Sequence, residues 1–315
     1  MHIVIPDDYQ DCVRTLDCFA KLAQHRVTVF NDSSKNIDVL AERFQDAEAI
    51  VLTRERTALT AALLERLPSL KLISQIGKVA QHIDLDACRR LGIAVAQGSG
   101  SGAATAELTW ALILASRRNL VAEANRVKQG LWQASLGQQL GGQRLGIWSY
   151  GRIGKQIAQY GKVFGMSVWV WGGLESTARA REDGIDVAES RDKFFAESDV
   201  LSLHIRLSEQ TRGIVTLSDL KKMKPSALVA NTSRAELIET GALEAALKIG
   251  TPGFAAVDVY DDEPLAGPGH PLVQLPNALC TPHLGYVERD NYENYFGTAF
   301  DNINNFAAGN ATNLV

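Results

Sequence analysis

Short apolar runs alternate with helical patterns along the whole chain. The first series of runs comprises His2–Ile5, Arg26–Phe30, Ala49–Leu52, Leu70–Ser74 and Ile93–Ala96. Helical stretches separate them, for example Ala41–Phe44 and Ala61–Leu67. Strands that alternate with helices form a parallel sheet covered by helices on both faces. The sequence therefore predicts an α/β fold.

A second alternating series begins near Arg144. Its predicted strands are Leu145–Ser149, Ser167–Trp171, Val200–Ile205, Ala227–Asn231, Phe254–Val259 and Leu279–Thr281. They number about six, as in a complete dinucleotide-binding sheet. Between the two series, the glycine-rich stretch Gln97–Gly102 leads into a helical pattern that we expect to run to Lys128 and to end at Gly130. We place a domain boundary at this stretch.

Composition narrows the class of protein. The 315 residues suggest two domains, and 46% hydrophobic with 22% charged residues is ordinary for a soluble globular protein. The formal net charge of −4 gives no sign of a nucleic-acid surface or of binding to an anionic membrane. A small anionic substrate would then be attracted by local arginines.

The cysteines and the N-terminus indicate a cytoplasmic location. Four cysteines occur without a CxxC pair, and we interpret them as reduced thiols. The first residues have neither the basic start nor the apolar core of a signal peptide, and no stretch approaches the roughly 20 apolar residues of a membrane span. The acidic pairs Asp7-Asp8 and Asp261-Asp262 lack metal-ligand spacing, so we expect no metal site.

An arginine, a glutamate and a histidine stand at or just beyond the ends of three predicted strands. Arg234 follows the run 227–233, Glu263 follows 254–260, and His283 follows 278–282. Ligands bind at the carboxyl edge of an open parallel sheet. A guanidinium, a carboxylate and an imidazole at that edge are suited to bind a small carboxylate and to move a proton. Taken singly, each has a structural alternative: a helix cap for Arg234, an exposed turn for Glu263 and a core or capping role for His283.

A nucleotide-binding pattern opens the second series. The segment Leu145-Gly146-Ile147-Trp148-Ser149 is a predicted strand, and Gly151 and Gly154 follow it at the start of a predicted helix. The pattern is the dinucleotide fingerprint in the form S-x-G-x-x-G. The second glycine lets the backbone approach a pyrophosphate, the third lets helix and strand pack closely, and the helix N-terminus stabilises the negative charge. The predicted cofactor contacts here are Ser149, Tyr150, Gly151, Arg152, Ile153 and Gly154.

The acidic residue expected about 20 positions further on, for the ribose hydroxyls, is missing from the strand end. Gly172 stands there, and Glu175 comes slightly late. Arg179 and Arg181 follow in the next predicted helix, where they are either solvated or attract a 2′-phosphate. We expect NAD as the cofactor, and NADP remains open.

Four motifs, in order and at matching spacing, resemble the D-isomer-specific 2-hydroxyacid dehydrogenases, in particular the branch similar to 3-phosphoglycerate dehydrogenase. They are Tyr150-Gly151-Arg152-Ile153-Gly154, Asn231-Thr232-Ser233-Arg234, Asp258-Val259-Tyr260-Asp261-Asp262-Glu263-Pro264-Leu265 and Thr281-Pro282-His283-Leu284-Gly285. The resemblance covers nearly the whole chain. The departures are Ala235, Arg206, Ser149 and Gly172, where this family usually has glycine, proline, glycine and an acidic residue.

The resemblance implies a role for each strand-end residue. Arg234 binds the substrate's carboxylate and carbonyl oxygen, His283 is the acid and base, and Glu263 pairs with it. Asp258 lies near the nicotinamide carboxamide, and Thr105, Thr232, Ser233 and Gly285 complete the cofactor contacts. On the substrate side, it implies a carboxylate-binding loop that uses backbone N–H groups, with Gly77, Lys78 and Val79, and an arginine, Arg54.

The resemblance also implies the fold and the assembly. Two parallel-sheet domains, similar to Rossmann and flavodoxin folds, are expected: a discontinuous substrate domain of residues 1–98 plus 288–315, and an inserted NAD(P)-binding domain of residues 99–287. A homodimer joined through the nucleotide-binding domains, with the active site in the interdomain cleft, is also implied. The expected partner is a small 2-hydroxy or 2-keto acid, whether phosphoglycerate-like, glyoxylate-like or bulkier, with no nucleic acid and no membrane.

Two other functions stay open. The same fold serves in NAD(H)-sensing corepressors, which bind a peptide partner and show little turnover. An enzyme that oxidises a one-carbon or inorganic acid is a further alternative, although that family has a different residue beside its histidine.

Overall fold

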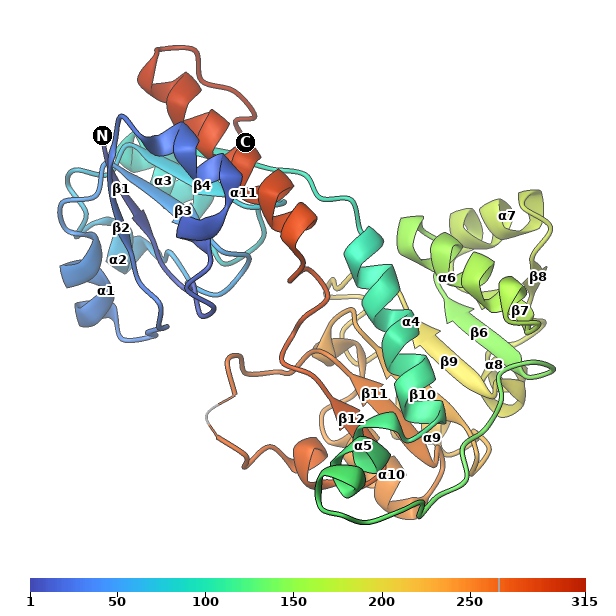
Figure 1. Cartoon of the computed structure of the whole chain (residues 1–315). Helices are drawn as coiled ribbons and strands as arrows, with labels where there is room; N and C mark the ends of the chain where they lie inside the picture. Colours follow the sequence, from blue (N-terminus) through green and yellow to red (C-terminus); the bar gives the residue numbers. More distant parts are fainter. Residues whose placement is uncertain (266) are drawn as a thin grey trace. The chain divides into compact units, whose positions relative to one another are not determined.

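The computed structural model describes residues 1–265 and 267–315. Its chain divides into two compact units. Unit 1 comprises Met1–Ser101 and Val287–Val315, and unit 2 comprises Gly102–Tyr286. In Figure 1, unit 1 is coloured blue to cyan with a red C-terminal segment, and unit 2 runs from green to orange. Both ends of the chain therefore belong to unit 1.

Unit 1 contains a five-stranded sheet in the order β2-β1-β3-β4-β5, in which every pair is parallel. The strands are β1 (His2–Ile5), β2 (Arg26–Val29), β3 (Ala49–Leu52), β4 (Leu72–Gln75) and β5 (Ala94–Gln97). All residues of the central strands β3 and β4 are buried, as expected for a parallel sheet covered on both faces.

Four of the helical segments of unit 1, the α-helices, begin at a side-chain cap. The helical segments are η1 (Val13–Thr15), η2 (Asp17–Leu22), α1 (Ile37–Phe44), α2 (Ala61–Leu64), α3 (Leu85–Leu91) and α11 (Arg289–Ala307). The side chains of Asn36, Thr60 and Asp84 accept backbone N–H bonds at the starts of α1, α2 and α3. Helix α11 packs against β4, where the Ser74 hydroxyl donates to the Ala299 carbonyl at 3.0 Å.

Unit 2 contains a seven-stranded sheet in the order β12-β11-β10-β9-β6-β7-β8, again with parallel pairs. The strands are β6 (Arg144–Trp148), β7 (Ser167–Trp171), β8 (Asp186–Val187), β9 (Val200–Leu203), β10 (Leu228–Asn231), β11 (Phe254–Val257) and β12 (Ala278–Cys280). Neighbouring residues on β10 enter opposite cores, with Val229 in one apolar cluster and Leu228 in the other.

Helices cover both faces of this sheet. They are α4 (Ala103–Arg117), α5 (Leu120–Lys128), α6 (Arg152–Val163), α7 (Leu174–Glu182), α8 (Arg191–Glu197), α9 (Leu217–Leu220), η3 (Ala235–Leu237), α10 (Ala242–Ile249) and η4 (Pro271–Gln274). Helix α4 packs on β10, β11 and α6 (Figure 1). The predicted α/β class with two parallel sheets is confirmed.

Two details of the sequence prediction were wrong. The helix expected to continue to Lys128 ends at Arg117, because Asn119 adopts a left-handed backbone with φ of 50°. Its side chain donates to the Ser135 hydroxyl at 3.0 Å, which holds the turn in place. The sheet of unit 2 has seven strands and not about six, because the two-residue strand β8 pairs with β7 at its edge.

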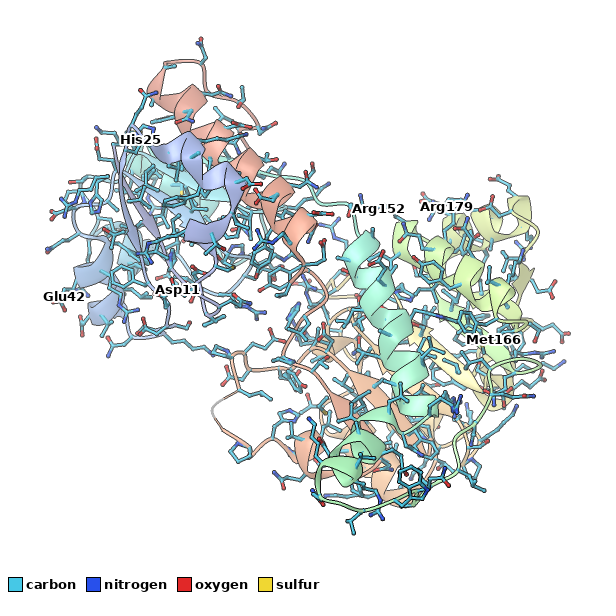
Figure 2. All side chains as sticks on the ribbon, in the orientation of Figure 1. Asp11, His25, Glu42, Arg152, Met166 and Arg179 are labelled. Carbon is cyan, nitrogen blue, oxygen red and sulfur yellow. The ribbon has the colours of Figure 1, made fainter. Side chains whose placement is uncertain are left out.

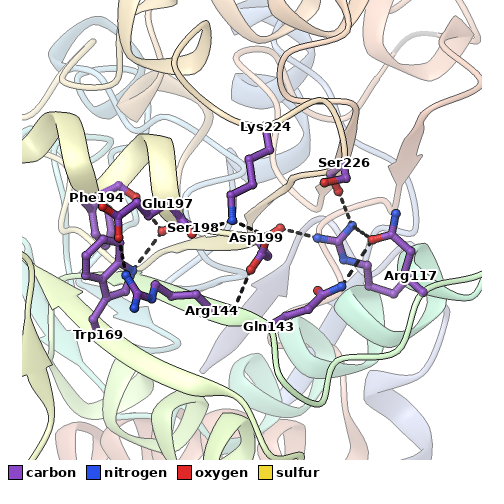
Figure 3. Close-up of polar contacts among 11 residues, drawn as sticks. Arg117, Gln143, Arg144, Trp169, Phe194, Glu197, Ser198, Asp199, Lys224 and Ser226 are labelled. Carbon is purple, nitrogen blue, oxygen red and sulfur yellow. Dashed lines mark hydrogen bonds and ion pairs between the residues drawn. The ribbon is translucent and has the colours of Figure 1, made fainter.

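Charged side chains form a hydrogen-bond network at the amino-terminal edge of this sheet (Figure 3). Arg117 is buried and donates to the carbonyls of Ser226, at 2.6 Å, and Asp199. The Asp199 carboxylate accepts from the Arg144 backbone N–H at 2.8 Å and from the Lys224 ammonium at 2.7 Å. Burial lowers the pKa of Arg117 to about 10. This network joins the starts of β6 and β9 and the turn before β10, while the opposite edge of the sheet carries the candidate site.

Within residues 1–265 and 267–315, no helix has both the length and the apolar character needed to cross a membrane.

Candidate active site

Arg234, Glu263 and His283 follow three strands that are neighbours in the sheet, β10, β11 and β12. The register pairs Asn231 with Val257 and Val257 with Cys280, so the three strands end level with one another. The sequence predicted these side chains at strand ends, and the structure places all three at the carboxyl edge of one sheet.

His283 and Glu263 are in direct side-chain contact. The imidazole Nδ1 lies 2.6 Å from Glu263 Oε2, and the two side chains are 17% and 15% exposed. Glu263 Oε1 accepts the backbone N–H of Tyr260 at 2.9 Å, which fixes the carboxylate from its other side. The ring of Tyr286 meets the imidazole edge-on with centroids 5.5 Å apart. Because Glu263 engages Nδ1, Nε2 is the ring nitrogen that could exchange a proton with a ligand.

Asp258 supports the turn that carries His283. Its carboxylate is fully buried and accepts three bonds: from the Thr281 hydroxyl at 2.6 Å and from the backbone N–H groups of Leu284 and Gly285, each at 2.8 Å. Burial raises the pKa of Asp258, and the three bonds oppose that shift. The observed contacts of Asp258 therefore give it a structural task, namely to order the segment from Thr281 to Gly285.

The turn after β10 presents Arg234. Asn231 bridges it, since its side chain donates to the Arg234 carbonyl at 2.9 Å and accepts from the Ser233 N–H at 3.1 Å. The Ser233 hydroxyl donates to the Ile205 carbonyl at 2.9 Å. Arg234 stands at the N-cap of η3 without a side-chain cap bond, so the capping alternative does not describe it. A guanidinium has five N–H donors in a planar fork and can bind a carboxylate through two of them.

Three of the predicted cofactor residues are joined by a threonine that sequence reasoning missed. The Thr109 hydroxyl lies 2.6 Å from the hydroxyl of Thr232 and donates to the Thr105 carbonyl at 2.7 Å. The Thr105 hydroxyl in turn donates to the Gly285 carbonyl at 2.7 Å. The network links α4 to the ends of β10 and β12. The signal for Thr109 was its position one helical turn after Thr105.

The turn after β6 fits a dinucleotide phosphate. A Cβ atom added to Gly154 would lie 2.4 Å from the Ser149 carbonyl oxygen, so only glycine allows α6 to lie this close to the turn. A Cβ atom on Gly151 would meet no atom within 4 Å, so the backbone is open to a ligand there. Gly151 is the N-cap of α6 and has no side chain that could cap the helix, and the first N–H groups of a helix are suited to bind an anion.

Ser149 takes the left-handed backbone that the fingerprint's first glycine normally supplies, with φ of 81°. Tyr150 is held by α7: its backbone N–H donates to the Ser176 hydroxyl at 2.6 Å and its phenol to Asp183 at 3.0 Å. Burial raises the pKa of Tyr150 to about 12. The bonds of Tyr150 to Ser176 and Asp183 hold the turn against α7.

The predicted substrate residues of unit 1 follow β3 and β4, at the carboxyl edge of that unit's sheet. Arg54 and Gly77 touch, since a Cβ atom on Gly77 would lie 2.7 Å from Arg54 Nη1. Gly77 has a left-handed backbone with φ of 79°, and Arg54 lies over the Tyr295 ring at 5.9 Å. Lys78 follows in the same loop, with an exposed side chain. The backbone N–H of Val79 donates to the Gln97 side chain at 3.3 Å, so this amide already has a partner within the unit.

Among residues 1–265 and 267–315, His, Cys, Asp and Glu side chains do not gather in groups of three that could hold a metal ion.

Comparison with known proteins agrees with this site. Residues 110–285 match the family model described as "D-isomer specific 2-hydroxyacid dehydrogenase, NAD binding domain". Over 286 residues, the chain is 35% identical to a glyoxylate reductase of Aeropyrum pernix. The match covers 86% of this chain and 83% of the relative. A D-3-phosphoglycerate dehydrogenase of Archaeoglobus fulgidus is 32% identical over 85% of this chain, and the chain spans about half of that relative, 51%.

The structure is also similar to a solved one. A phosphoglycerate oxidoreductase of Vibrio cholerae superposes with a TM-score of 0.96 at 52% identity, covering 98% of this chain and 99% of the other. The corepressor alternative gains no support from these relatives. The chain belongs to the D-isomer-specific 2-hydroxyacid dehydrogenases and is an NAD-binding oxidoreductase that acts on the CH–OH group of a 2-hydroxy acid.

Proposed function

We propose that the chain interconverts a small 2-keto acid and its D-2-hydroxy acid, with His283 as acid and base. The observation that carries this proposal is the 2.6 Å contact between His283 Nδ1 and Glu263 Oε2 at the end of the sheet. In the reducing direction, the protonated imidazole donates from Nε2 to the carbonyl oxygen as negative charge develops there. In the oxidising direction, the neutral imidazole accepts the hydroxyl proton.

Glu263 orients the imidazole. Its second oxygen is fixed by the Tyr260 N–H, so the carboxylate cannot turn away from the ring without breaking that bond. Glu263 therefore acts through His283 and does not itself contact the substrate.

Arg234 binds the substrate's carboxylate and carbonyl oxygen through its planar fork, which fixes the keto acid in one plane. Within unit 1, the candidate substrate contacts are the Arg54 guanidinium and the loop from Gly77 to Val79. Within that loop, the Val79 amide is engaged by Gln97, so Gly77 and Lys78 are the stronger candidates for backbone contacts to an anion.

Unit 2 holds the dinucleotide. The turn Ser149–Gly154 and the N-terminus of α6 bind the pyrophosphate, while the residues joined by Thr109 line the nicotinamide side. When bound, the nicotinamide supplies or accepts the hydride. The chain's own contribution is to orient the reacting groups and to place the proton.

The substrate is a short acid of the glyoxylate and hydroxypyruvate class, the class that the names of the relatives carry. Arg54 and Arg56 in unit 1 favour members with a second anionic group, such as phosphohydroxypyruvate. A panel of glyoxylate, hydroxypyruvate, phosphohydroxypyruvate and bulkier 2-keto acids, each assayed with NADH and NADPH, tests the proposal. Turnover of at least one short acid is expected, and a protein that binds a dinucleotide yet reduces no member of the panel would refute it.

We further propose that a second copy of the chain covers the apolar surface of α5 and the loop after it. No residue of α5 is buried. The side chains of Trp132 and Leu136 are 74% and 97% exposed, and they line one groove with Leu120 and Val127. Apolar side chains gathered on an exposed surface are typical of an interaction surface. The proposed assembly is a cytoplasmic homodimer, and the four free thiols are compatible with a reducing compartment.

A further inference from the structure

Two glycines follow strand β7, at the position that selects between the two dinucleotides. In dinucleotide-binding sheets, a carboxylate at this strand end bonds to the ribose 2′-hydroxyl of NAD, and its charge repels the 2′-phosphate of NADP. Here β7 ends at Trp171 and is followed by Gly172 and Gly173. Neither carries a side chain, so this chain lacks that source of repulsion.

The two glycines border the phosphate-binding turn. Trp148 of β6 pairs with Trp171 of β7, so the residues after the two strands are neighbours. A Cβ atom on Gly172 would lie 3.6 Å from the Cα atom of Ser149 and 3.0 Å from the Ser176 hydroxyl oxygen. A Cβ atom on Gly173 would meet no atom within 4 Å, which leaves open space at that position.

An arginine is fixed beside the same turn. Arg179 Nε donates to the Tyr150 carbonyl at 3.3 Å, which ties its guanidinium to the turn from the side of α7. Figure 2 shows Arg179 and Arg152, the first residue of α6, at the same edge of unit 2. Glu175 approaches Arg179 to 3.7 Å, but its side chain is 91% exposed, and such a pair leaves the guanidinium available to a stronger anion.

We propose that the space beside Gly173 and Arg179 receives the 2′-phosphate of NADPH, so that the chain binds NADPH at least as tightly as NADH. The inference rests on the proposed function, because it assumes that the turn Ser149–Gly154 binds the dinucleotide. Arg179 supplies the charge-assisted bonds to the phosphate, and the glycine pair supplies the room. NAD(H) binds through the same turn without using Arg179.

A matched pair of variants at Gly173 tests the proposal. Gly173 has φ of −68° and ψ of 169°, angles that any residue adopts, and it is the N-cap of α7. Asp and Asn are both good N-caps, so Gly173→Asp and Gly173→Asn should fold equally well and differ only in charge. Dissociation constants are measured by titrating the fluorescence of NADPH and of NADH without substrate. We expect Gly173→Asp to weaken NADPH binding by about tenfold or more relative to Gly173→Asn. The dissociation constants of the two variants for NADH should differ by less than about threefold.

A second pair separates Arg179 from its neighbour. Arg179→Gln should weaken NADPH binding by about tenfold and leave NADH binding nearly unchanged, while Arg181→Gln, on the same helix, should alter neither. The inference is overturned if the unmodified protein binds NADH more tightly than NADPH. It is also overturned if Gly173→Asp and Arg179→Gln weaken the binding of NADPH and of NADH equally. If neither dinucleotide binds the unmodified protein, the proposed function itself fails.

Discussion

Two bonds hold the carboxylate of Glu263, one to the imidazole of His283 and one to the Tyr260 backbone. Glu263→Gln keeps the shape of the side chain and removes the charge, so the imidazole loses the carboxylate that orients it. We expect kcat/KM for keto-acid reduction to fall by about 100-fold. Steady-state kinetics at saturating cofactor measure the effect.

Asp261 provides the control, because its side chain is exposed. Asp261→Asn should change kcat/KM by less than about twofold, since a carboxylate in solvent contributes little to a distant reaction. An equal loss in the two variants would mean that the charge of this loop matters and the contact with His283 does not.

Asp7 gives unit 1 a predicted pH dependence. Its carboxylate is buried after β1, where Oδ2 accepts the Thr57 hydroxyl at 2.7 Å and Oδ1 has no hydrogen-bond partner in the described part of the chain. Burial raises the pKa of Asp7 above its ordinary value of 3.8. The stability that protonated Asp7 contributes is therefore complete below that ordinary value and is lost as the pH rises through the raised pKa.

Asp7→Asn stays neutral at every pH and tolerates the left-handed backbone of this position, φ of 64°. As the pH rises from about 4 to about 8, the unmodified protein should lose stability relative to the variant. The urea midpoint of the variant should therefore rise relative to that of the unmodified protein. A difference that stays constant between these two pH values would show that Asp7 carries no buried charge.

At the residue scale, the strand-end rule was sufficient to predict that Arg234, Glu263 and His283 lie at one edge of a sheet, because the carboxyl ends of parallel strands meet there. It could not identify Thr109 or the support that Asn231 gives to Arg234, since those bonds depend on which hydroxyls and amides face each other in space. The bond from the Val79 amide to the Gln97 side chain could not be predicted for the same reason, since Val79 lies in the loop after β4 and Gln97 ends β5.

At the scale of elements, two glycines have different roles in the turn between β6 and α6. One allows close packing and the other allows the backbone to approach a ligand. Gly154→Ala places a methyl group 2.4 Å from the Ser149 carbonyl oxygen, so the helix must shift. We expect a loss of about 2 kcal/mol or more in the free energy of unfolding. Thermal and urea denaturation measure it.

Gly151→Ala is the counterpart, because its methyl group meets no protein atom within 4 Å. We expect its stability to remain within about 0.5 kcal/mol of the unmodified protein, while dinucleotide affinity falls, because the methyl group occupies the space of the pyrophosphate. The account of this turn would be wrong if Gly151→Ala bound the dinucleotide normally.

The alternation of strands and helices was readable in the sequence because parallel strands buried on both faces are continuous apolar runs. The exceptions are informative. The apolar spacing of α4 and α5 gave no sign of a break, because the left-handed turn at Asn119 leaves the helical pattern on either side intact. Strand β8 was missed because two residues, one of them the exposed Asp186, are too few to show a pattern.

At the scale of the whole molecule, the exposed apolar surface of α5 and its loop predicts self-association. Leu136→Asp places a charge at the most exposed of its apolar side chains. We expect the dimer dissociation constant to rise by about tenfold or more in sedimentation velocity, since charges are depleted at interface cores. Val163→Asp, an exposed position on α6 outside this surface, should leave the dimer intact. A protein that is monomeric before any substitution would contradict the proposed assembly.

The most direct measurement is the rate of keto-acid reduction by His283→Asn, with dinucleotide binding measured on the same sample. Asparagine tolerates the left-handed backbone at this position, φ of 53°, and removes the proton donor. We predict that kcat falls by about 1,000-fold while the dissociation constant for the dinucleotide changes little. A variant that binds the dinucleotide and retains a rate within a few fold of the unmodified protein would contradict the assignment of His283 as acid and base.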